Sequence, residues 1–202
     1  MKKKYIIILI SALIFIILAR ILLISGLLYL AFSSSEIKVN TDINKYNNYI
    51  GEKAKEEYQN KWGIDESIFP KKTNNINEVE DYKMVYYNPW DAQYLSYLVV
   101  NYNDYEYQNE IERLQKYEST KYLGYYGVRG FDKYALLAME ADSYNGFVYA
   151  ITDGNNKIIY VELIFCNYQY DFDYENYINK DYLPVGFNAK ENNPYQTIHQ
   201  KY

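Results

Sequence analysis

The sequence predicts an α+β fold: an N-terminal membrane-spanning helix, followed by one domain in which an antiparallel sheet of about five strands carries two packed helices. Three observations predict this fold. A long stretch of mostly apolar residues covers positions 5–32. After it, short runs rich in branched and aromatic residues alternate with turn sequences. Two longer stretches carry apolar residues at spacings of three and four, which is typical of helices.

Residues 5–32 are long enough to span a bilayer once. As an α-helix they would measure about 42 Å, against a hydrocarbon core of about 30 Å. Lysines at positions 2–4 precede the stretch, so the positive-inside rule leaves residues 1–4 as a cytoplasmic stub and exports the remainder. A secretory signal has a shorter apolar region, and we therefore expect an uncleaved anchor, although the small residues at 31–35 would suit cleavage.

Arg20 lies near the middle of this apolar stretch. A charge at that depth opposes insertion by roughly 2.5 to 3.5 kcal/mol, which the many Leu, Ile and Phe side chains outweigh. We expect Arg20 either to snorkel along the helix or to contact an acidic group of a membrane partner.

The part after the apolar stretch divides into a polar linker at 33–40, an extracytoplasmic domain at 41–183 and a loop or flexible tail at 184–202. Its size suits one domain better than two. Beyond the apolar stretch the chain carries 17 basic against 26 acidic residues, a net charge of −9. Nucleic acid is therefore not expected as a partner.

Two stretches of the domain predict helices. The first runs from residue 42 to 62 and ends at Gly63, a residue typical of helix C-termini. Its apolar stripe consists of Ile43, Tyr46, Ile50, Ala54, Tyr58 and Trp62. Lys61 falls on the opposite, charged face, which should be solvated. The second helix runs from about 104 to 117, with Asp104 as its N-cap.

The runs that predict strands are 83–87, 93–102, 134–141, 147–152 and 157–168. The last three are separated by strong turn sequences and form an antiparallel meander. Because these three are apolar on both faces, both sides of the sheet should be covered. We expect the helices on one side, and loops or the segment around Pro70 on the other.

The 28 tyrosines have two interpretations. Many alternate with polar residues in the strand runs and are expected in the core. The other interpretation is an aromatic surface for ligand contact.

Few groups in the sequence point to bound ions or cofactors. Cys166 is the only cysteine, so no intrachain disulfide can form, and its apolar neighbours predict a buried thiol. Asp171, Asp173 and Glu175 lie close together but lack the spacing of a calcium loop. No phosphate loop, zinc spacing or nucleophile motif is present, so we expect no cofactor and no metal.

Glu140 and Glu162 are the two acids set within otherwise apolar strands, and they are the candidate catalytic residues. Counting across the turns places both opposite Phe147 or Val148, in one row on one face of the sheet. Two strand spacings would put their backbones about 9.6 Å apart, and glycosidases use carboxyl separations of about 5 to 9.5 Å. Alternatively, each glutamate accepts hydrogen bonds from tyrosines such as Tyr160 or Tyr149, or emerges at an edge of the sheet.

Three segments carry a resemblance: IDESIFP at 64–70, NPWDAQY at 88–94 and VELIFCNY at 161–168. They resemble segments of an uncharacterised family of membrane-anchored exported proteins from AT-rich Gram-positive bacteria. The resemblance implies a surface protein and carries no activity.

These observations favour a membrane-anchored extracytoplasmic module with a non-enzymatic binding or accessory role at the cell surface, acting on a protein or cell-envelope partner. The alternative is an extracytoplasmic hydrolase that uses the paired carboxylates.

Overall fold

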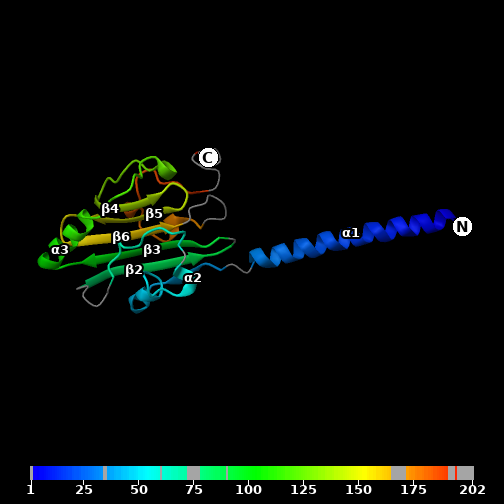
Figure 1. Ribbon diagram of the computed structural model, residues 1–202, viewed down its shortest axis with the longest axis horizontal. Coiled ribbons are helices and arrows are strands. Elements are labelled where there is room, and N and C mark those ends of the chain that lie inside the picture. Colours follow the sequence, from blue (N-terminus) through cyan, green and yellow to red (C-terminus); the bar gives the residue numbers. More distant parts are fainter. Residues whose placement is uncertain are drawn as a thin grey trace. The chain divides into compact units, whose positions relative to one another are not determined.

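The computed structural model describes residues 2–33, 36–59, 61–71, 78–89, 91–164, 172–190 and Pro194 (Figure 1). The chain forms two compact units, Met1–Glu36 and Ile37–Tyr202. Cys166, Asp171 and the end of the predicted strand at 157–168 lie outside the described residues.

The first unit is the helix α1 (Lys2–Ser33). Its segment Lys4–Leu30 is long and apolar enough to cross a membrane, and none of it is buried. A signal sequence near an N-terminus has the same properties. Arg20 is exposed among the apolar side chains of this helix. The predicted candidate span is therefore present.

The second unit is built on a six-stranded antiparallel sheet, which confirms the predicted α+β class. Its strands are β1 (Lys38–Asn40), β2 (Glu78–Tyr87), β3 (Gln93–Asn101), β4 (Ala135–Asp142), β5 (Gly146–Thr152) and β6 (Lys157–Ile164). They lie in the order β1-β2-β3-β6-β5-β4 (Figure 1). The predicted linker at 33–40 is too long, because its last three residues form β1 and pair with β2.

The helices of the domain are short. They are the α-helices α2 (Glu56–Gln59) and α3 (Asp104–Gln115) and the 3₁₀ helices η1 (Ile43–Asn48), η2 (Tyr125–Gly127), η3 (Tyr174–Asn176) and η4 (Lys180–Tyr182). Helix α3 matches the second predicted helix, with Tyr107 and Leu114 buried. Its N-cap is Asn103 rather than Asp104, since the Asn103 side chain accepts a hydrogen bond from the amide of Glu106.

The first predicted helix, 42–62, is wrong as a continuous element. Only η1 and α2 form, because the backbone turns at Gly51, where φ is +80°, and the Gly51 amide donates to Glu66 Oε2 at 3.1 Å instead of continuing a helix. The stripe is nevertheless buried: Tyr46, Ile50, Ala54 and Tyr58 are at most 4 % exposed. Trp62, the last residue of the predicted stripe, is 37 % exposed. The spacing therefore predicted the burial of four of the six residues correctly, and helicity incorrectly.

Each face of the sheet has its own core. The first face, which carries Val148, is covered by η1, α2, α3 and the segment around Phe69. The second face, which carries Phe147, is covered by η2, η3 and the chain up to Ala189. Loops cover the second face as predicted, but the segment before Pro70 packs beside the helices on the first.

Residues 184–190 carry no helix or strand, but they are packed rather than loose. Backbone hydrogen bonds of 2.8 Å join Arg129 to Val185 and Val185 to Gly130. Gly186 has φ +83°, and a Cβ there would lie 2.5 Å from the Gly127 carbonyl oxygen. A side chain at this position would therefore separate the two segments.

The outer edge of β4 is sealed by the residues that follow α3. The Ala141 amide donates to Thr120 Oγ1 at 2.6 Å, and the Met139 amide donates to Ser119 Oγ at 3.1 Å. The Thr120 amide in turn donates to the Met139 carbonyl oxygen at 2.9 Å. Polar backbone groups at this edge are thus satisfied within the domain.

Candidate functional site

The two predicted acids lie in one row of the sheet. Glu140 of β4 pairs with Val148 of β5, and Val148 pairs with Glu162 of β6. The row continues to Ser96 of β3. Val148 belongs to the core of the first face, so both glutamates point to that face. The predicted register and common face are confirmed.

Glu162 has no exposed surface. The ammonium of Lys61 donates to both of its carboxylate oxygens, at 2.9 and 3.0 Å, and Ser96 Oγ donates to Oε1 at 2.6 Å. Lys61 is only 3 % exposed and also contacts Glu66 Oε1. The three charged residues Lys61, Glu66 and Glu162 form what we call the buried triad.

The triad holds one cation and two carboxyl groups. Burial raises the pKa of Glu162 to about 7, against the opposing effect of the Lys61 ammonium. Burial alone would lower the pKa of Lys61, but Glu162 and Glu66 hold it above its ordinary value. The cluster is closest to neutral when Lys61 is charged and one glutamate is protonated, which is the state that burial favours.

Glu140 is half-buried and has different partners. The Tyr117 hydroxyl lies 3.0 Å from Glu140 Oε2 and 3.2 Å from Asp65 Oδ2. Burial, with the neighbouring Glu140, raises the pKa of Tyr117, so it stays a hydrogen-bond donor. Burial alone would raise the pKa of Asp65, but the hydroxyl and amide of Ser67 and the hydroxyl of Tyr117 hold it below its ordinary value.

The two acids therefore share a row but no partner. The segment 61–67 supplies Lys61, which binds both Glu162 and Glu66. It also supplies Asp65, which accepts from the Tyr117 hydroxyl beside Glu140. The two tyrosines named in the prediction donate elsewhere: Tyr160 donates to Glu110 at 2.6 Å, and Tyr149 donates to the carbonyl oxygen of Tyr182. The expected kind of partner is confirmed for Glu140, which accepts a hydrogen bond from the Tyr117 hydroxyl. The prediction that hydrogen-bond partners surround both acids is correct.

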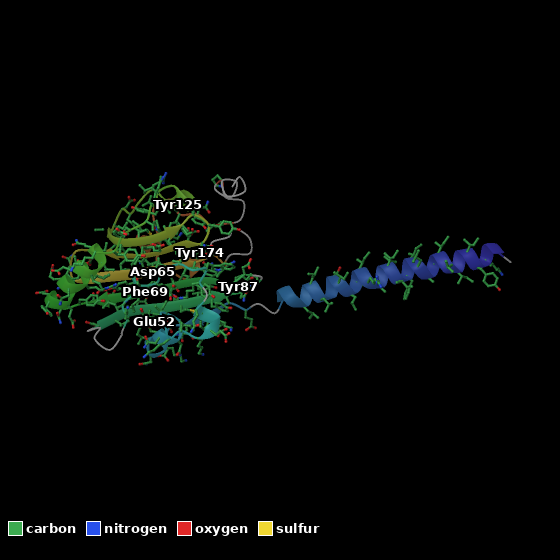
Figure 2. The ribbon with its side chains drawn as sticks, in the orientation of Figure 1. Glu52, Asp65, Phe69, Tyr87, Tyr125 and Tyr174 are labelled. Atoms are coloured by element: carbon green, nitrogen blue, oxygen red, sulfur yellow. The ribbon has the colours of Figure 1, made fainter. Side chains whose placement is uncertain are left out.

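A cavity of about 930 Å³ opens beside the triad. Its lining combines charged, amide, hydroxyl and aromatic groups: Tyr46, Asn47, Ile50, Gly51, Glu52, Lys53, Gln59, Asp65, Glu66, Ser67, Phe69, Pro70 and Lys71. Figure 2 labels three of them: Asp65 is uppermost in the view, Phe69 lies below it and Glu52 is lowest. Glu66 is the triad member that reaches this cavity, and its side chain is 16 % exposed.

Sequence reasoning missed Lys61, Glu66, Ser96 and Tyr117. The predicted helix places Lys61 on the solvated face. However, Lys61 follows Tyr58 by three residues, which is also a spacing found within the buried stripe. The direction of Lys61 depends on the turn at Trp62, where φ is +58°. No local pattern identifies such a turn at a tryptophan.

Of the three acids at 171–175, the structure describes Asp173 and Glu175. Asp173 and Glu175 are exposed and make ion pairs with Lys190 and Lys180. Within the described ranges, no group of three or more His, Cys, Asp or Glu side chains has the arrangement of a metal site.

Comparison of the chain with protein-family models, with curated proteins and with solved structures found no match.

Proposed function

We propose that this protein is a single-pass membrane protein whose α+β domain lies outside the cytoplasm and serves as a non-enzymatic binding or accessory module. One observation carries the non-enzymatic part of the proposal. Glu162, the acid set deepest in the apolar strands, has no exposed surface and accepts hydrogen bonds on both oxygens. A carboxylate in that position stabilises the domain rather than meeting a substrate.

The membrane part rests on α1 and on the lysines that precede its apolar stretch. Their positive charge favours a cytoplasmic N-terminus and an exported domain. The acidic domain has little affinity for the anionic cytoplasmic leaflet, which is consistent with this orientation.

Binding is proposed at the cavity beside the triad. Its volume of about 930 Å³ lies within the range of ligand pockets, roughly 300 to 1,000 Å³. Its polar lining from Asn47, Gln59 and Ser67 suits a polar cell-envelope component or a polar segment of a protein partner.

Topology is tested first. Protease added outside intact cells without a wall should remove the C-terminal region, while the untreated chain sediments with the membranes. A protected C-terminus, or a chain released in soluble form into the medium, would overturn the anchored orientation.

Binding is tested by proximity labelling at the surface of living cells. Asn47→Trp should fill part of the cavity and remove the labelled partner, because Asn47 is an exposed lining residue of η1. The matched control is Asn176→Trp, an exposed position of η3 on the second face. Equal labelling by the wild type and both variants would place binding elsewhere.

The alternative is a hydrolase that uses Glu140 and Glu162, and their common row is the observation that favours it. Glu140→Gln and Glu162→Gln separate the two proposals. Loss of a glycan-cleaving activity at retained stability would support the hydrolase, whereas lower stability without a change in any activity supports the binding module.

A further inference from the structure

Lys61 is a buried amine held against a buried carboxyl group. Its Nζ lies 2.9 and 3.0 Å from the two carboxylate oxygens of Glu162, and both side chains are almost fully enclosed. Groups fixed at this separation react as if at very high local concentration, equivalent to about 10⁵ to 10⁸ M in well-oriented cases. An amine and a carboxyl group in that arrangement can condense to an amide.

The surroundings favour the reactive form of the carboxyl group, whereas Glu162 and Glu66 hold Lys61 as an ammonium that must lose a proton before it can react. Burial raises the pKa of Glu162 to about 7, so a neutral acid, which an amine can attack, is populated near neutral pH. Ser96 Oγ, at 2.6 Å from Oε1, polarises the carboxyl group. The Tyr94 ring, whose centroid lies 5.4 Å from Lys61 Nζ, keeps water from one side of the amine.

Glu66 supplies the base that the reaction needs. Its Oε1 contacts Lys61 Nζ, and its Oε2 is oriented by the Gly51 amide at 3.1 Å. Glu66 also lines the cavity, so a proton and a water molecule can leave through it.

We propose that Lys61 and Glu162 are a self-modification site, at which an amide bond forms between Lys61 Nζ and Glu162 Cδ with Glu66 as general base. The Lys61 ammonium first gives a proton to the Glu66 carboxylate. The neutral amine then attacks Cδ of the protonated Glu162. The C–OH bond breaks, and the hydroxyl leaves as water with a second proton from the nitrogen. Glu66 ends protonated and releases its proton through the cavity, and no oxidant or reductant is required.

The bond would join residues 101 positions apart. It would fasten the segment that carries Lys61 and Glu66 to β6 at the centre of the domain. With Cys166 as the only cysteine, the chain cannot close such a loop with a disulfide. The cross-link would serve the stability of an exported domain and needs only a single turnover.

The test is peptide mass mapping of the full chain, purified in detergent and digested with trypsin after denaturation. The expected result is a branched peptide that joins Lys61 to Glu162, lighter than its two parts by one water molecule, with no cleavage after Lys61. Unlinked peptides throughout the folded wild type would overturn the proposal. A link from Lys61 to Glu66 would overturn the assignment of Glu162 as the electrophile.

Three variants sharpen the test. Lys61→Arg keeps a cation but should give no branched peptide, whereas Lys116→Arg, at an exposed position outside the cavity lining, should link as the wild type does. Glu66→Gln keeps both reacting groups and should slow linkage by roughly 100-fold or more, as loss of a general base does. Circular dichroism checks that each variant is folded, and wild-type linkage in folded Glu66→Gln would contradict the role of Glu66.

Discussion

Short helices and irregular segments pack against both faces of the sheet. The interactions that fix these segments differ between the two faces. The first face encloses charged and polar side chains, namely Lys61, Ser96, Thr152 and Glu162. The buried part of the second face is mainly aromatic and aliphatic, with ring pairs such as Tyr126 with Phe147, whose centroids lie 5.4 Å apart.

This difference shows two ways of fixing a cover that has little regular secondary structure. On the second face, the covering segments are positioned by the packing of aromatic rings and aliphatic side chains. Substitutions that change side-chain shape moderately should be tolerated there. On the first face, each buried polar group needs its own partner in one register, so a single lost partner is costly. The first face therefore gains specificity from the triad, and the second gains stability from buried area.

The largest expected effect comes from removing the cation. Lys61→Met should lower the free energy of unfolding by at least about 3 to 5 kcal/mol, because it leaves Glu66 and Glu162 without their counter-charge and also removes the amine that the proposed cross-link needs. On the second face, Met139→Leu conserves volume and should cost less than about 1.5 kcal/mol. Urea denaturation of the full chain in detergent, followed by circular dichroism, measures both. Equal losses would remove the contrast between the faces.

An intermediate effect compares two tyrosine hydroxyls. Tyr160→Phe removes a hydrogen bond to the Glu110 carboxylate on the first face, and a bond to a charged group is worth about 1.5 to 3 kcal/mol. Tyr149→Phe removes a bond to the Tyr182 backbone carbonyl on the second face, worth about 0.5 to 1.5 kcal/mol. Thermal unfolding of both variants tests the order, and a larger loss for Tyr149→Phe would reverse it.

The smallest effect concerns Asp65 beside Tyr117. Since the folded state lowers the pKa of Asp65, its contribution is present above the unfolded-state pKa and is lost as pH falls through the folded-state value. Asp65→Asn should therefore cost at most about 1 kcal/mol at neutral pH, because the group is largely solvated. The difference should vanish in strong acid. A difference that persists there in urea titrations would exclude the charge as its cause.

Much of the sheet could be predicted from the sequence, because alternation and turn residues act locally. The meander from β4 to β6 and the common row of Glu140 and Glu162 both follow from counting residues across turns. The strand β1 could not be predicted, since three residues carry no alternation and depend on pairing with β2.

The triad could not be predicted either, because it too depends on contacts between segments that are distant in the chain. Lys61 meets Glu162 across 101 residues, and its direction depends on two breaks in the helical path, at Gly51 and Trp62. The Gly51 break is held by Glu66, 15 residues away. Propensity describes only the nearest neighbours in the chain, whereas this site is assembled by contacts between distant segments.

The two edges of the sheet have a consequence when copies of this domain meet at high local density. Exposed strand edges would invite such copies to pair and join into extended sheets. The Ser119–Thr120 cap closes the β4 side. On the other side β1 pairs with only Met84–Tyr86 of β2, and the exposed acids Glu78, Glu80 and Asp81 occupy the preceding stretch of β2. Crowded copies of the domain should therefore repel one another and remain separate.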